Sequence, residues 1–167
     1  ERTPNPDGTF DSALKGAIAD SENYWQTEDI YRRMEFAIKC AYAHGTKAIR
    51  THIDCFDKQA EISLSVFKSL QQKWVDKITL QAVTLVGLDY YQTDAGVALA
   101  DKIVKVGGIL GGVAYSNPDL DNQLDTVFSL AKQRGLNLDF HADENGDLDS
   151  HCLRKIAEAA IRHKFEK

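Results

Sequence analysis

Cysteine and long apolar runs are both scarce in this chain, and each shortage narrows the class of protein it can be. The three cysteines, Cys40, Cys55 and Cys152, are an odd number at wide spacing without a CxxC pair, which argues against a disulfide framework and suits a reducing compartment. No apolar run approaches the roughly 20 residues that a membrane span needs, and residues 1–6 hold no signal-peptide core. We therefore expect a cytoplasmic protein with no membrane partner.

A basic surface stripe and the glycine motifs of nucleotide-binding loops are also missing. The net charge is -5 and the pI is about 5.5, and lysine and arginine are scattered among acidic residues, so no nucleic-acid partner is expected. Neither the GxGxxG of dinucleotide-binding sheets nor the GK[ST] of a phosphate-binding loop occurs. Both kinds of nucleotide site are therefore excluded.

The length and composition are those of one globular domain. With 167 residues and 43% hydrophobic side chains, residues 1–167 can bury a sizeable core as a single domain. Residues 1–9 differ, because Pro4, Pro6 and Gly8 make them an irregular lead-in without a hydrophobic period. No initiator methionine precedes this proline-rich opening, so we expect the chain to be part of something longer.

Strand and helix patterns alternate along most of the chain, at a period of roughly 30 residues. A short helix within 10–19 and a helix from a Thr27 cap to Gly45 come first. Apolar strand patterns at 48–54, 78–86, 109–115 and 136–140 then alternate with helical patterns at 60–75, 93–106 and 120–134. This alternation predicts an α/β fold with parallel strands covered by helices.

Two architectures share this pattern, an open doubly wound sheet and a (βα)8 barrel. Polar residues follow several successive strands, at 51–54, 89–90, 115–117 and 141–144. Barrel sites draw on many strands, so this distribution favours the barrel. Because a complete TIM-type barrel needs about 250 residues, the chain is expected to form part of one.

Segment 136–149 combines a strand pattern with the densest set of chemically active side chains. Apolar and polar residues alternate over 136–140, and His141 stands where that strand is expected to end. Asp143 and Glu144 follow at once, and Asp149 or Ser150 is placed to cap a helix that begins near residue 151. At the carboxyl end of a parallel strand, a histidine and two carboxylates can supply one metal ligand and one proton carrier.

Two plainer interpretations of this segment stay open at the level of the residues. Asp143, Asn145, Asp147 and Asp149 alternate as calcium ligands do, although Leu148 replaces the glycine and Arg154 the glutamate of a calcium-binding loop. The segment can also be a solvated acidic turn without chemistry, which is the usual role of Asp, Asn and Gly between a strand and a helix.

Two segments of the chain resemble a known family. RTHID at Arg50 to Asp54 is similar to the second-strand segment, and LDFHADE at Leu138 to Glu144 to the fifth-strand segment, of the cytosine deaminase-like branch of the amidohydrolase superfamily. The opening RTPNPDGTF resembles the loop after the first barrel strand of these enzymes. The resemblance covers nearly the whole chain and implies a barrel segment that runs from after strand 1 to about helix 5.

The resemblance implies a metal-dependent hydrolase of C–N bonds in a small nitrogen heterocycle such as cytosine or a triazine. His141 would then bind a divalent Zn or Fe ion, and Glu144 would be the general acid/base that moves a proton between a metal-activated water and the leaving amine. Asp143, His52 and Asp54 would orient the metal ligand or touch the substrate. Independently of the resemblance, His52 shares one strand face with Arg50 and Asp54, which predicts a hydrogen-bonded network below the site.

Other parts of the family's site lie outside this sequence. The resemblance places a first-strand His-x-His pair before Glu1, and a sixth-strand His and an eighth-strand Asp after Lys167. We therefore expect the chain alone to be an inactive partial barrel that self-associates through open strand edges. The pyrimidine-reading Gln of the cytosine enzymes is missing from Thr84 to Leu88, which argues against cytosine itself. A non-catalytic α/β ligand-binding domain is the alternative function.

Overall fold

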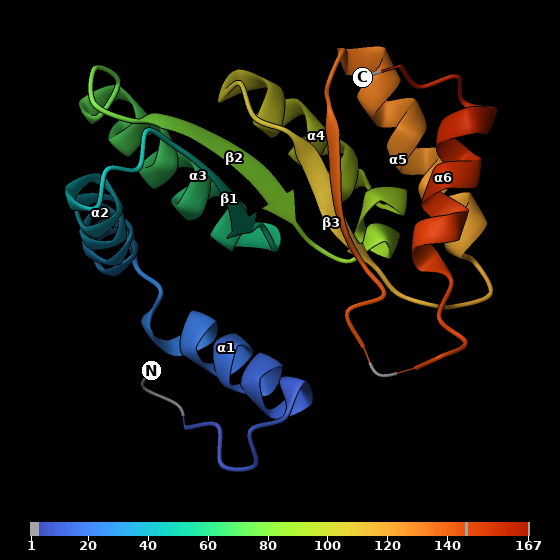
Figure 1. Ribbon diagram of the computed structural model, residues 1–167, viewed down its shortest axis with the longest axis horizontal. Helices are drawn as coiled ribbons and strands as arrows, with labels where there is room; N and C mark the ends of the chain where they lie inside the picture. The colour runs from blue at the N-terminus through green and yellow to red at the C-terminus, as the bar shows by residue number, and fades with distance from the viewer. Residues whose placement is uncertain (1–3, 146, 167) are drawn as a thin grey trace.

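The computed structural model describes residues 4–145 and 147–166 (Figure 1). Residues 4–9 form an irregular lead-in, as expected, while residues 1–3 of that prediction lie outside the described part. Helices and strands then follow in the order α1 (Phe10–Tyr24), α2 (Thr27–Ala43), β1 (Ala48–Asp54), α3 (Asp57–Lys73), β2 (Thr79–Leu85), the 3-10 helix η1 (Leu88–Gln92), α4 (Asp94–Lys105), β3 (Leu110–Ala114), α5 (Leu120–Arg134), β4 (Leu138–Ala142) and α6 (Cys152–Arg162).

The strands are parallel and lie side by side in chain order (Figure 1). β1 pairs with β2, and β3 pairs with β4, each in a regular ladder. Shorter bridges, Val83 with Ile109 and Gly87 with Val113, join β2 to β3. The predicted α/β fold with parallel strands is therefore present.

The sheet is strongly curved, as the wall of a barrel is. In a flat sheet, β1 and β4 would lie about 14 Å apart, because neighbouring strands are spaced by about 4.8 Å. Yet the imidazole rings of His52 in β1 and His141 in β4 have their centroids 4.4 Å apart. Only a sheet that bends towards this face brings such short side chains together, so the polar face is the concave one.

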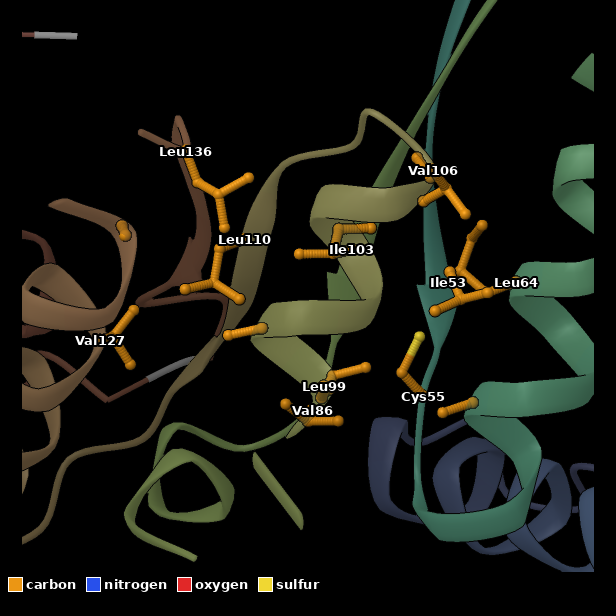
Figure 2. Packing of buried hydrophobic residues seen from close by; sticks show 14 of the residues in the cluster. Ile53, Cys55, Leu64, Val86, Leu99, Ile103, Val106, Leu110, Val127 and Leu136 are labelled. Atoms are coloured by element: carbon orange, nitrogen blue, oxygen red, sulfur yellow. The ribbon is translucent and has the colours of Figure 1, made fainter. Parts of the chain in front are cut away.

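The other face of the sheet packs against α3, α4 and α5. Alternate strand residues on that face are buried and apolar, among them Ile53, Ala82 and Leu110. Figure 2 shows Leu64 of α3, Ile103 of α4 and Val127 of α5 projecting towards these strands. Burial of such side chains supplies most of the stabilisation, and it fixes which residues of each strand point to the concave side.

Two expected boundaries were wrong in ways that affect the site. β4 begins at Leu138, two residues later than expected, because Gly135 and Leu136 complete the end of α5. Gly135 is left-handed with φ 65°, and the Leu136 N–H donates to the Ala131 carbonyl at 2.9 Å, an arrangement typical of helix ends. His141 therefore lies within β4 and not after it.

The bounds of the first two helices also differ from the sequence-based expectation. Thr27 is the first residue of α2 instead of its cap, and Gln26 occupies the cap position without a side-chain hydrogen bond. α1 extends past Ala19 to Tyr24, and Figure 1 shows this helix clear of the strands. Among the described residues, no helix has both the length and the apolar character required to cross a lipid bilayer.

A buried side-chain network joins β2 to β3 where backbone pairing is interrupted. Ile109 N–H and Val113 N–H donate to backbone carbonyls of β2 and the residue after it, but Gly111 N–H, which lies between them, donates to the Thr84 hydroxyl at 2.8 Å. The Tyr91 hydroxyl lies 2.7 Å from the same Thr84 oxygen and donates to the Gly111 carbonyl at 2.7 Å. Burial raises the pKa of the Tyr91 phenol, so it remains a donor at neutral pH.

Thr84→Val should lower the free energy of unfolding by about 1–3 kcal/mol, the cost of leaving a buried donor unpaired. Valine fills the same space but cannot accept the Gly111 N–H. Urea unfolding followed by circular dichroism measures the loss. Thr126→Val is the matched control, because its hydroxyl donates to the Asn122 carbonyl on an exposed helix surface. Equal losses in the two variants would contradict a special role for the Thr84 hydroxyl.

The edges of the sheet are open in this chain. Among the described residues, β1 has only β2 as a neighbour and β4 has only β3. On α6, Leu153 and Ile161 are 65% and 78% exposed, so this helix presents an apolar strip to solvent. Unpaired edges and apolar strips of this kind promote association.

The chain should therefore form dimers or larger assemblies in solution. Sedimentation velocity from about 1 to 50 micromolar, the range in which exposed edges cause association, should show a mass that rises with concentration. Leu153→Glu with Ile161→Glu should shift the distribution towards the monomer. A monomer throughout this range would contradict the prediction that these edges promote association.

Candidate active site

The concave face carries polar side chains from β1 and β4 at alternate positions. Arg50 and His52 come from β1, and Asp139 and His141 come from β4. Since residues two apart in a strand point to the same side, the two pairs face one another across the curved sheet. Phe140, between Asp139 and His141, packs against the core on the helix side, and this fixes the direction of the β4 pair.

Asp139 links the two outer strands. Its Oδ2 accepts a hydrogen bond from the Arg50 guanidinium at 2.9 Å, and its Oδ1 lies 3.2 Å from His52 Nε2. Arg50 Nε also donates to Gln81 Oε1 at 2.8 Å, which brings β2 into the network. Hydrogen bonds between charged groups are stronger than neutral ones. This network therefore fixes the side chains of β1 against which His141 packs.

His141 is held on both sides. The His52 ring meets it edge to face at an interplanar angle of 76°. Its Nδ1 lies 3.0 Å from Glu144 Oε2, and a carboxylate can only accept there, so Nδ1 carries a proton. In the neutral ring Nε2 then has the free lone pair, which is the form that binds a metal ion.

The Nε2 atom of His141 is buried and, within the described part of the chain, has no hydrogen-bond partner. A buried polar atom without a partner is costly and rare, and a bound ion or ligand is a common reason for it. His141 thus fits the metal that the family resemblance implies. No group of three or more His, Cys, Asp or Glu able to hold a metal ion occurs among residues 4–145 and 147–166, so His141 is a single candidate ligand here.

Asp143 points away from His141. Its backbone has φ 57°, and its carboxylate accepts hydrogen bonds from the Ser150 hydroxyl at 2.5 Å and from the N–H groups of Cys152 and Leu153 at 2.9 and 2.8 Å. The Ser150 bond first, and then the backbone N–H bonds, lower the pKa of Asp143 to about 2. Asp143 therefore caps α6, and the expectation that Asp149 or Ser150 caps this helix was wrong.

Asp54 ends β1 on the concave side, two residues after His52. Burial raises the pKa of its carboxyl group. In the part of the chain that the structure describes, it makes no hydrogen bond to Arg50 or His52, so the predicted network includes Asp139 where Asp54 was expected.

The calcium interpretation of this turn is not supported by its contacts. Asn145 Oδ1 accepts from the Asp147 N–H at 3.0 Å, and Asp147 Oδ1 accepts from the Asp149 N–H at 2.9 Å. With Asp143 bonded to α6, these oxygens serve the backbone instead of converging on one point. Gly146 lies outside the described residues.

Of the site residues named from the sequence, His141, Glu144 and His52 come together, while Asp143 bonds to α6 and Asp54 lies outside the network of His52 with Asp139. Asp139 and Gln81 were missed. Asp139 could have been found from spacing, because it precedes His141 by two residues as Arg50 precedes His52, and opposite charges on facing strand faces pair. No sequence pattern identifies Gln81, because its contact with Arg50 depends on the register of β1 with β2.

Comparisons with known proteins agree with this description. The chain is 45% identical over 166 residues to a pterin deaminase of Rhizobium rhizogenes (strain K84 / ATCC BAA-868), covering 99% of this chain and 38% of that protein. It is 23% identical over 156 residues to an N-isopropylammelide isopropyl amidohydrolase of Pseudomonas sp. (strain ADP), covering 90% of this chain and 39% of that protein. No family model matches the chain.

Solved structures share the fold. Two crystal structures of 5-methylcytosine deaminase from Klebsiella pneumoniae, with phosphonocytosine and with 5-fluorocytosine, each superpose with a TM-score of 0.81 at 24% and 25% identity. They cover 94% and 95% of this chain and 39% of the deaminase chain. The chain thus spans about two fifths of its relatives' length, and the predicted part of a (βα)8 barrel is confirmed.

Proposed function

We propose that this chain, which belongs to the amidohydrolase superfamily, carries one metal ligand and the proton-transferring carboxylate of a hydrolase that cleaves C–N bonds in nitrogen heterocycles. His141 is the ligand and Glu144 is the general acid/base. The observation that carries this proposal is the buried Nε2 of His141, which has no partner among the described residues while Glu144 holds Nδ1 of the same ring.

Each residue has a distinct task in the proposed reaction. A bound divalent ion supplies Lewis-acid chemistry, which lowers the pKa of water towards neutrality. His141 presents Nε2 to that ion because Glu144 fixes the proton on Nδ1. Glu144 is 65% exposed on its side chain, so its carboxylate can also reach a substrate. It takes a proton from the attacking water and returns it to the nitrogen that departs.

Hydrolysis of an amino group on a ring carbon adds one water and releases ammonia. The new C–O bond forms as the C–N bond breaks, and the leaving nitrogen must be protonated before it departs as a neutral amine. One carboxylate can serve both proton transfers if it lies within hydrogen-bond reach of both atoms. The position of Glu144 on a turn at the carboxyl end of β4, where barrel enzymes hold their active sites, supports this assignment.

The substrate class we propose is an aminated nitrogen heterocycle, with a pterin as the first candidate. The relative at 45% identity is named a pterin deaminase, and the chain lacks the Gln expected of cytosine enzymes between Thr84 and Leu88.

The proposal is tested by grafting residues 1–167 into the Rhizobium rhizogenes pterin deaminase in place of the matching segment. The chimera should bind close to one equivalent of Zn or Fe, measured by elemental analysis, and release ammonia from pterin faster than from cytosine. A folded chimera that binds metal but releases no ammonia from any of a panel of aminated heterocycles would contradict the proposed reaction. A folded, metal-free chimera that binds heterocycles would favour a non-catalytic binding domain.

A further inference from the structure

We propose that Asp143 is a positioning residue: its carboxylate fastens the turn after β4 to α6, and the turn so held places the Glu144 carboxylate on His141. The inference rests on the proposed function for its importance to the reaction, but the geometry it concerns can be measured without any reaction. It assigns Asp143 a task separate from metal binding and from contact with a substrate.

The backbone at Asp143 sets the direction of the next side chain. A φ of 57° is in the left-handed region, where Asp and Asn are tolerated better than most residues because of their short polar side chains. The reversal at this residue sends neighbouring side chains in opposite directions. Asp143 reaches α6, and Glu144 reaches back to His141 within β4.

The Asp143 carboxylate is saturated by contacts with the start of α6. Oδ1 accepts from the Ser150 hydroxyl and the Cys152 N–H, and Oδ2 accepts from the Leu153 N–H at 2.8 Å. Negative charge is stabilised at a helix N-terminus, where N–H groups lack partners within the helix. These contacts span the seven to ten residues from Asp143 to Leu153 and close the turn into a loop with fixed ends.

α6 is a firm anchor for this loop. Cys152 and Ala159 are buried against the rest of the domain, and Lys155 pairs with Asp121 of α5 at 2.6 Å. At its other end the helix is tied to Asp125 through Arg162. Because the Asp143 carboxylate is bonded to this helix, the position of α6 determines the position of the turn.

Glu144, in contrast, has little else to hold it. Its side chain is 65% exposed, and its hydrogen bond to His141 Nδ1 is the one that the described structure gives it. An exposed glutamate loses rotamer entropy when it is held by a single bond. Its placement over His141 therefore depends on the backbone that Asp143 fixes.

The test measures the proximity of Glu144 to His141 in the full chain by nuclear Overhauser contacts between the His141 ring protons and the Glu144 side-chain methylenes. Asp143→Ala should weaken these contacts at least about fivefold, as expected when one dominant rotamer is replaced by several of similar energy. Asp143→Asn keeps an acceptor oxygen and tolerates the left-handed backbone, so it should retain most of the signal. Asp147→Ala is the matched control on the same turn and should leave the contacts unchanged.

Amide hydrogen exchange at Cys152 and Leu153 separates positioning from simple capping. Faster exchange together with loss of the His141–Glu144 contacts in Asp143→Ala supports the proposal. Faster exchange with those contacts retained would overturn it, because Asp143 would then be a helix cap and nothing more. If Asp143→Ala fails to fold, the same measurements are made on Asp143→Gly, because glycine accepts the same φ without the carboxylate. Loss of the His141–Glu144 contacts in that variant supports the proposal, and their retention overturns it.

The proximity measurement is independent of catalysis. If the grafted pterin deaminase proved inactive while Asp143→Ala still displaced Glu144, the proposed function would fail and the positioning role would stand. In an active chimera, Asp143→Ala should lower kcat with little change in metal content, and Asp143→Asn should restore much of the rate.

Discussion

Glu144→Gln in the grafted pterin deaminase should lower the rate of ammonia release by roughly 10²-fold or more, the size of effect expected when a positioned general acid/base is lost. Glutamine keeps the length of the side chain, and its amide oxygen can still accept from His141 Nδ1. The metal ligand should therefore remain in place. Steady-state kinetics with elemental analysis of the same sample should show a lowered kcat at unchanged metal content.

Glu158→Gln is the matched control for this variant. Glu158 lies on α6, pairs with Arg154 on the protein surface, and has no contact with β4 among those described. Its substitution should leave the rate within about twofold, as surface changes usually do. Normal turnover in Glu144→Gln together with loss of activity in Asp143→Asn would show that the role of proton carrier has been assigned to the wrong carboxylate.

His141→Ala should remove the metal. Loss of a residue that merely orients a ligand lowers metal affinity by roughly 10–100-fold, and loss of the ligand itself should exceed this. The neighbouring groups cannot replace it, because His52 is bonded to Asp139 and Glu144 loses its own partner when the imidazole is gone. Competition with a chelator of known affinity measures the change.

His151→Ala is the corresponding control. This histidine is exposed at the start of α6 and makes no side-chain cap bond, so its removal should leave metal affinity unchanged. Equal losses in the two variants would mean that metal binds outside the β4 site, and a His141→Ala protein with full metal content would remove His141 from the set of ligands.

Apart from η1, the order and type of the elements after residue 26 could be predicted from the sequence because each depends on local pattern. Alternation in β2 and the 3.6-residue period of α4 are set by which side chains must be buried, and the buried Leu80, Leu99 and Ile103 obey that rule. The likeness of segments 50–54 and 138–144 to the amidohydrolases also predicted part of a (βα)8 barrel, and the solved structures agree on the fold.

The contacts that depend on curvature could not be predicted. Whether Asp54 or Asp139 bonds His52 depends on how far the sheet bends between β1 and β4, and no local pattern records that angle. The prediction of the residue that caps α6 failed for a related reason. Sequence rules look for a cap immediately before a helix, whereas the carboxylate that performs this task, Asp143, lies nine residues before Cys152 and reaches it only because its backbone is left-handed.

The bond between Arg50 and Asp139 has a kinetic consequence. It joins residues 89 positions apart, whereas the bond between Arg50 and Gln81 spans 31. By the logarithmic dependence of loop closure on length, the longer closure costs about 1 kcal/mol more in chain entropy. Contacts of such long range tend to form late and to slow folding. The network of Arg50, Asp139 and His52 beside His141 should thus assemble after the helices and the β1–β2 ladder. A refolding chain should therefore form its secondary structure before it forms its site.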